Sequence, residues 1–132
     1  DKIFMKEKLE IQIEQLEKAI GRLKETLSLE PTQVNKDATI QRFEFTFELS
    51  WKLMKTFAFN KGLETVSPKD SLRTAAQLGL IEDVEMWFDF LDARNNSSHV
   101  YNENMASEVY EEIKKFLPTV KKLMVKIKAS VI

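Results

Sequence analysis

Cysteine is absent from this 132-residue sequence, and histidine occurs once, as His99. Without cysteine, these residues form no disulfide, offer no thiol nucleophile and supply no thiolate metal ligand. One histidine is too few for a histidine-based zinc site within one chain, so stable metal binding would need carboxylates alone. We therefore expect no metal site and no cofactor.

Long apolar runs are also missing. No run approaches the roughly 20 residues that cross a bilayer, and the first residues lack the signal-peptide pattern of charge, apolar block and small-residue cleavage site. This pattern favours a cytoplasmic protein without a membrane segment. Apolar residues make up 43% of the sequence and charged residues 31%, which is typical of one soluble domain, so we expect a single domain over residues 1–132.

An excess of one charge is missing as well. The sequence has 20 Lys and Arg against 21 Asp and Glu, a net charge of −1, whereas a nucleic-acid-binding domain usually carries a basic surplus. The charges are nevertheless uneven, because residues 82–92 hold five acids and no base while residues 113–132 hold six Lys and no acid. We interpret both segments as solvated helix faces rather than binding patches.

The period-two pattern of strands does not occur, and apolar residues instead recur every three or four positions, which predicts helices. The first helix carries a stripe from Leu9 to Leu27, and Pro31 ends it before a loop over residues 31–37. A second helix, apolar on most sides, is predicted over about residues 36–60, followed by a short one from Ser67 and Pro68 to Leu78. Two more are predicted over about residues 81–91 and 105–127. The last of these should kink or break at Pro118.

Four long helices and one short helix predict an all-α fold, an antiparallel four-helix bundle with an extra short helix. The stripe on the first helix and the apolar surface of the second exceed what one bundle buries. We therefore predict a homodimer, because an isologous helical interface is the usual way to cover such a surplus. The alternative is a monomer whose fifth helix covers it.

The single histidine lies in a polar segment, Arg94-Asn95-Asn96-Ser97-Ser98-His99-Val100-Tyr101, between two apolar helices. Such a segment belongs at a helix end or in a loop. Arg94 and His99 would lie about 140° apart on a continuous helix, so they converge only if the helix ends between them or if two chains pool their residues. Arginine offers a fork of donors for phosphate, histidine carries protons near neutral pH, asparagine can position a substrate, and tyrosine offers a ring or a hydroxyl group. The alternative role for the segment is capping and surface hydrogen bonding.

The spacing of Arg94, His99 and Tyr101 resembles the R-x4-H-x-Y signature of the HEPN superfamily of helical proteins. A second segment, IQRFEFTFELSWK over residues 40–52, is similar to the hallmark of one HEPN branch, the nucleotidyltransferase substrate-binding protein family. The resemblance covers about residues 5–125. Further similar residues are Ser67, Pro68, Arg73, Gly79, Leu80, Ile81 and Trp87.

This resemblance implies one of two functions. In the first, the chain is a dimeric subunit that binds a nucleotide or acceptor substrate for a separate minimal nucleotidyltransferase, which carries the metal-binding carboxylates. In the second, it is a metal-independent endoribonuclease toxin of a toxin–antitoxin pair, and the partner silences it by adenylylating Tyr101. By analogy, Arg94 steadies the phosphate, His99 transfers protons and Asn95 positions the substrate. The chain is an enzyme in the second function and not in the first, and the resemblance does not choose between them.

Four charged residues in the apolar segment 36–60 also need a role, namely Arg42, Glu44, Glu48 and Lys52. Glu48 lies one turn from both Glu44 and Lys52 and can face either. The functional interpretation places all four in a substrate or partner-facing cleft beside Arg94, and Arg42, Glu48 and Lys52 join the predicted site. The equally weighted alternative is a structural ion-pair ladder on an exposed face. Trp51 and Trp87 are predicted to be core residues rather than base-stacking platforms.

Overall fold

This computed structural model describes residues 2–99 and 102–131, and regular secondary structure in this part of the chain is entirely helical. The predicted all-α class is therefore confirmed. Its five helices are α1 (Lys2–Leu27), α2 (Gln33–Asn60), α3 (Pro68–Gln77), α4 (Val84–Ser97) and α5 (Glu103–Ser130).

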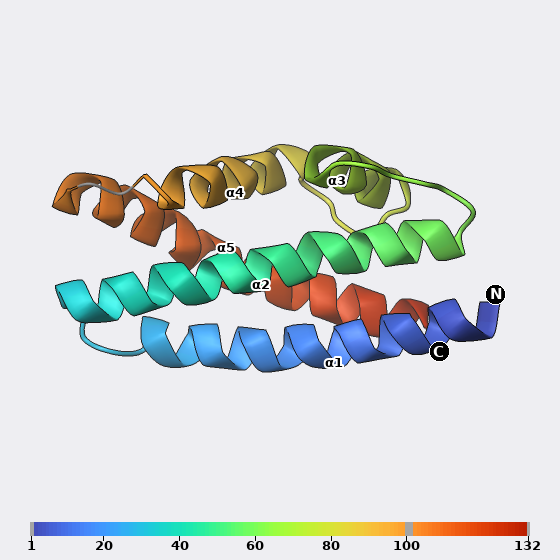
Figure 1. Cartoon of the computed structure of the whole chain (residues 1–132), viewed down its shortest axis with the longest axis horizontal. Coiled ribbons are helices and arrows are strands. Elements are labelled where there is room, and N and C mark those ends of the chain that lie inside the picture. Colours follow the sequence, from blue (N-terminus) through green and yellow to red (C-terminus); the bar gives the residue numbers. More distant parts are fainter. Residues whose placement is uncertain (1, 100–101, 132) are drawn as a thin grey trace.

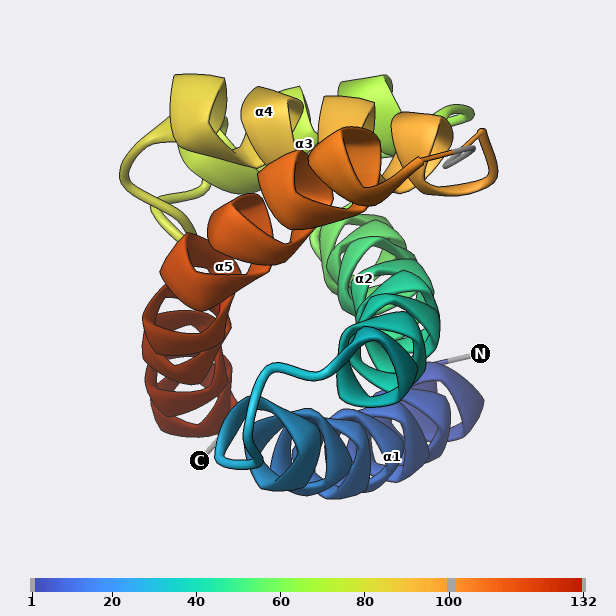
Figure 2. The same cartoon turned by 90° about the vertical axis from the view of Figure 1, so that its left-hand side faces the viewer.

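The four longer helices form an antiparallel bundle with α3 as the extra short helix. Figure 2 shows α1, α2, α4 and α5 arranged around one core, and Figure 1 shows α3 on the same side of the molecule as α4. Among the described elements, α2 packs against all four other helices. The apolar character of α2 on most sides is explained by this central position.

Side-chain caps set where the helices begin. Thr32, Ser67, Asp83 and Asn102 each accept a hydrogen bond from the backbone N–H three residues later. The cap at Thr32 starts α2 several residues before the predicted boundary near residue 36, so the predicted loop over residues 31–37 is too long. Capping rather than the apolar stripe decides this boundary, since the first turn of α2 is polar.

Glycines end two of the helical segments as predicted. Gly62 and Gly79 follow the ends of α2 and α3 and have φ values of +85° and +77°, the left-handed conformation that side chains disfavour. The N–H groups of the next residues, Leu63 and Leu80, return to carbonyls of the preceding helix at 2.9 Å. Both turns therefore satisfy carbonyl groups that the helix itself leaves unpaired.

The core centres on the ring of Phe116 in α5, whose residue is fully buried. Its centroid lies 5.0 Å from that of Phe43 in α2, 5.2 Å from Phe90 and 5.7 Å from Trp87, all in edge-on geometry. Such edge-to-face contacts add to the stability from apolar burial. The prediction that Trp87 is a core residue is confirmed, whereas Trp51 is only half-buried.

Pro118 lies inside α5, where we predicted either a kink or a break. The break does not occur, because the helix continues through the proline. Figure 2 shows that α5 changes direction along its length, as expected where proline removes one backbone hydrogen bond. Flanking buried residues, Phe116 and Val120, anchor both halves in the same core. Tertiary packing therefore carries the helix across the proline.

Some large apolar side chains stay exposed, and the predicted homodimer would have to cover part of this surface. Dimerisation stays a prediction. Within residues 2–99 and 102–131, no helix combines the length and the apolar content that crossing a bilayer requires. The exposed large apolar residues are Ile11, Leu29, Val34, Phe45, Phe59, Leu63, Val66 and Val125.

Replacing the central ring tests this description of the core. Phe116→Ala should lower the free energy of unfolding by about 3–5 kcal/mol, because it leaves a cavity among rings from two other helices. Phe45→Ala is the matched control: Phe45 is 60% exposed, and its loss should change stability by about 0.5 kcal/mol or less. Urea titration followed by circular dichroism measures both values, and equal losses would contradict the assigned core.

Candidate functional site

The polar segment 94–101 lies where α4 ends and the chain turns toward α5. Helix α4 stops at Ser97, between Arg94 and His99, so one of the two conditions for their convergence is met. The backbone N–H of His99 donates to the Asn96 carbonyl at 2.9 Å, and the His99 side chain is exposed. Asn95 is also exposed, and Tyr101, the predicted modification site, lies outside the described residues.

Glu48 on α2 holds the Arg94 side chain. Arg94 Nε donates to Glu48 Oε1 at 2.8 Å, and both side chains are about one-third exposed, at 31% and 32%. The other carboxylate oxygen, Oε2, accepts from Trp51 Nε1 at 3.1 Å. Two donors therefore fix the carboxylate, and the carboxylate fixes the guanidinium group.

The geometry of the pair leaves the far end of Arg94 available. Among the described residues, Glu48 is the hydrogen-bond partner of the Arg94 side chain and receives only its Nε–H. The two terminal Nη groups carry the remaining donors of the guanidinium fork. A fork that is oriented and partly exposed in this way suits a phosphate or carboxylate ligand.

Arg42 is directed toward α1 rather than toward Arg94. Its Nη1 donates to the Arg22 carbonyl at 2.6 Å and to Glu25 Oε2 at 3.3 Å. Arg42 and Glu48 are six positions apart, about 120° around α2, which explains why they serve different neighbours. Arg42 thus contacts α1, and among the described residues no hydrogen bond or ion pair joins it to Glu48 or Arg94.

Lys52 follows Glu48 by one helical turn and is exposed. It lines a separate groove that also contains Trp51. The structure therefore brings Glu48 directly to Arg94, places Lys52 one turn away and removes Arg42 from the group. Trp51 is the site residue that the sequence interpretation missed, because its apolar ring had been placed in the core.

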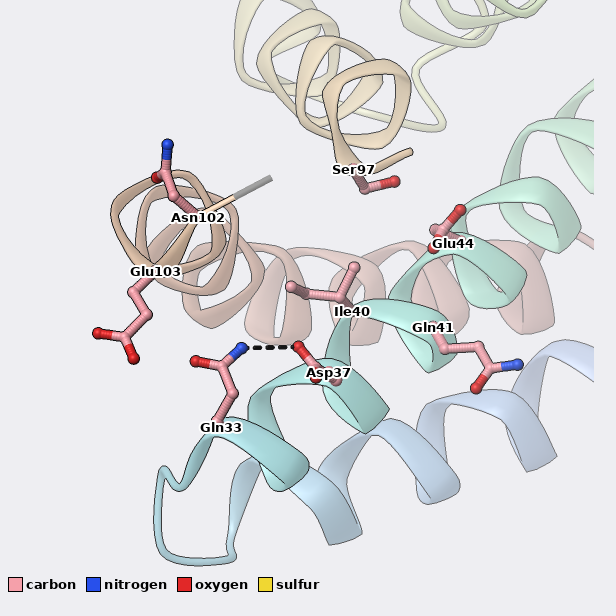
Figure 3. A pocket seen from close by; sticks show the side chains of 8 residues that line it. All are labelled: Gln33, Asp37, Ile40, Gln41, Glu44, Ser97, Asn102 and Glu103. Carbon is pink, nitrogen blue, oxygen red and sulfur yellow. Dashed lines mark hydrogen bonds between the residues drawn. The ribbon is translucent and has the colours of Figure 1, made fainter. Parts of the chain in front are cut away.

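A cleft of about 550 Å³ opens beside the end of α4. Figure 3 shows its lining side chains, which come from α2, from the last residue of α4 and from the start of α5. Gln33 Nε2 donates to Asp37 Oδ1 at 2.9 Å within it. The lining residues are Gln33, Asp37, Ile40, Gln41, Glu44, Ser97, Asn102 and Glu103.

The cleft continues the face of α2 that carries Glu48. Its polar members on α2 recur every three or four residues and therefore lie in one stripe. That spacing was visible in the sequence, but it was obscured by the apolar residues around it. Carboxylates and amides in this position can exchange hydrogen bonds with hydroxyl groups and with the edges of aromatic heterocycles. The stripe runs through Gln33, Asp37, Gln41, Glu44 and Glu48.

Among residues 2–99 and 102–131, no three His, Asp or Glu side chains are placed to hold a metal ion together. Within the cleft, Asp37 accepts the hydrogen bond from Gln33.

The helical bundle and the arginine near the end of α4, oriented by Glu48 of the central helix α2, define the class, a small all-helical protein. Residues 11–129 match the family described as nucleotidyltransferase substrate binding protein like. The chain belongs to this family. The sequence resemblance is thereby confirmed.

Three relatives illustrate the membership. A solved structure from Thermus thermophilus is 36% identical with a TM-score of 0.75, covering 88% of this chain and 98% of that one. A second solved structure, from Haemophilus influenzae, is described as revealing the fold of a substrate binding domain of a nucleotidyltransferase. It is 30% identical with a TM-score of 0.67, and the match covers 93% of this chain and 98% of that one.

The third relative, also from Haemophilus influenzae, is named "Probable ribonuclease HepT". It is 41% identical over 83 residues, which are 59% of this chain and 57% of that protein. The chain thus matches little more than half the length of this relative.

A double-mutant cycle tests whether Glu48 and Arg94 act as a pair. Glu48→Ala and Arg94→Ala should show a coupling of about 1 kcal/mol in the free energy of unfolding, because both side chains are largely shielded and share a short charged hydrogen bond. The control pair is Glu14 and Lys18, 3.7 Å apart and at least 70% exposed, with an expected coupling of about 0.3 kcal/mol. Additive effects at Glu48 and Arg94 would contradict the pairing.

Proposed function

We propose that this chain is the nucleotide- or RNA-binding subunit of a two-component system with a separate minimal nucleotidyltransferase. The observation that carries the proposal is the Glu48–Arg94 pair, 2.8 Å between Oε1 and Nε, which orients the guanidinium at the helix end. An arginine held through Nε presents its remaining donors to one phosphate in a fixed direction. Family membership supports the same function.

Within this proposal each residue of the signature has a stated role. Arg94 binds the phosphate, Asn95 positions the substrate, and His99 and Tyr101 complete the site. Lys52 adds a positive charge one turn along α2 from Glu48. Glu48 is a positioning residue, since it acts on the ligand through Arg94.

The proposed assembly has three components. Two copies of the chain form the homodimer, which brings a second set of signature residues to the cleft. The nucleotidyltransferase subunit supplies the metal-binding carboxylates for nucleotidyl transfer, and we expect the pair to act in the cytoplasm. The exposed apolar side chains, among them Leu29 and Val34, are consistent with such interfaces.

A second candidate function is a metal-independent endoribonuclease, the toxin of a toxin–antitoxin pair. The relative named "Probable ribonuclease HepT" favours it. In this reaction a base takes the proton of the ribose 2′-OH, the 2′ oxygen attacks phosphorus, and the bond to the 5′ oxygen breaks as an acid protonates it. One His99 of the dimer would serve as base and the other as acid, while Arg94 stabilises the charge on the phosphate.

Substitution of the two signature residues separates binding from cleavage. If the chain only binds, His99→Asn should retain most of its affinity for RNA, whereas Arg94→Ala should lose roughly tenfold or more, since a charged hydrogen bond to phosphate is worth about 1.5–3 kcal/mol. If the chain cleaves, the parent should degrade a mixed cellular RNA pool in the presence of a chelator, and His99→Ala should not. Filter binding and gel electrophoresis give the two readouts.

The two results discriminate clearly. Absence of cleavage by unmodified, mass-verified protein would reject the ribonuclease candidate and leave the binding subunit. Affinity for RNA and nucleotides that is unchanged in Arg94→Ala would reject both.

Modification of Tyr101 is tested by co-expression with a minimal nucleotidyltransferase. We expect intact-protein mass spectrometry to detect one or more added adenylyl groups, and peptide mapping to place them on Tyr101. Tyr110 provides an internal control, because it is the only other tyrosine and is 5% exposed. Tyr101→Phe should abolish the added mass, and an adenylyl group on Tyr110 or on another residue would contradict the assignment.

A further inference from the structure

A second groove lies on α2, about two turns beyond the Arg94 site. Its volume is about 720 Å³, within the range of sites that bind small organic ligands. We call it the lysine–aromatic groove. The members that matter for its chemistry are Lys8 and Gln12 of α1, and Trp51, Lys52, Lys55 and Phe59 of α2.

Positive charge gathers in this groove although the whole chain is nearly neutral. Lys8, Lys52 and Lys55 line it together with a single acid, Glu64. Within residues 2–99 and 102–131, none of these three lysines is joined to a carboxylate by an ion pair. Three ammonium groups against one carboxylate leave a positive surplus around the cavity, which attracts an anion.

Two aromatic rings are available in the same groove. Phe59 is 47% exposed, although leaving so much apolar ring in water is unfavourable. The Trp51 ring is half-buried, and its N–H bond to Glu48 fixes its orientation. Fixed or exposed rings beside lysines form the arrangement on which nucleic-acid bases stack while the lysines follow the backbone.

We propose that the lysine–aromatic groove binds a stretch of single-stranded RNA that leads to the Arg94 site. Lys52 stands one turn from Glu48, and Trp51 lines the groove while donating to the carboxylate that orients Arg94. The same face of α2 carries acidic residues in the cleft, Asp37 and Glu44, and basic residues in the groove, Lys52 and Lys55. The proposal rests on the proposed function, because it supplies the extended part of the same substrate.

Tryptophan fluorescence tests the groove directly. The probe is a short 2′-O-methylated oligouridine, which lacks the hydroxyl group needed for cleavage and so reports binding alone. We expect it to quench Trp51, while Trp87, at 1% exposure, provides a constant background. Trp51→Phe should remove the quenching. Uridine monophosphate should bind much more weakly than the oligonucleotide, because it engages only part of the groove.

Two pairs of variants assign the binding to this surface. Lys55→Gln should make the slope of log affinity against log salt concentration shallower by about 0.7, the value for one lost phosphate contact on a single strand. Phe59→Ala should weaken binding about fivefold or more, which corresponds to one lost base stack. The matched controls, Lys121→Gln and Val125→Ala, change exposed residues on α5, one charged and one apolar, and should alter neither quantity.

Three outcomes would overturn the proposal: absence of quenching, equal effects of the control variants, or uridine monophosphate binding as tightly as the oligonucleotide. The last would indicate a nucleotide subsite instead of a strand path. Arg94→Gln distinguishes failure of the groove from failure of the proposed function. If Arg94→Gln weakens binding while Lys55→Gln and Phe59→Ala do not, the Arg94 site stands and the groove is rejected.

Discussion

Packing of the Phe116 ring against rings from α2 and α4 is the interaction on which the rest of this structure depends. Phe43, Phe90 and Trp87 surround it at centroid distances of 5.0–5.7 Å. Close-packed rings tolerate little displacement, so this cluster sets the position of α4 relative to α2. That position in turn decides whether Arg94, near the end of α4, reaches Glu48. The geometry of the Glu48–Arg94 pair is therefore a consequence of aromatic packing deeper in the bundle.

The charged residues of α2 show how one central helix serves several neighbours. Arg42 secures α1 through the Arg22 carbonyl and Glu25, whereas Glu48 secures α4 through Arg94. Each contact satisfies a partly shielded charge, which is the condition for keeping such groups on a packed helix. Because Glu48 also accepts from Trp51, the site and the adjacent groove share one carboxylate. A ligand that orders Trp51 would act on the same group that orients Arg94.

Much of the fold could be predicted from the sequence because its signals are local. Apolar spacing located the four long helices, whereas Ser67 with Pro68 at its start and Gly79 at its end located the short one, and Gly62 marked the end of α2. The start of α2 was misplaced because Thr32 extends the helix through polar residues that carry no apolar stripe. The expected interruption at Pro118 was overestimated, since buried residues on both sides hold the helix in one core. For the site, the signature located Arg94 and His99, but it did not show that Glu48 and Arg42 face different helices.

Periodicity, turn residues and a spaced signature are properties of the chain alone, and they are sufficient to predict the helical class, the family and the residue types of the proposed site. Which of those side chains meet depends on how the helices pack. Residues 46 positions apart, Glu48 and Arg94, form the pair that orients the site, and the order of residues along α2 does not specify which neighbour each face receives. The cleft and the lysine–aromatic groove are equally products of packing, because their walls come from separate helices. Contacts of this kind depend on how whole helices pack against one another, and a local sequence pattern does not specify that packing.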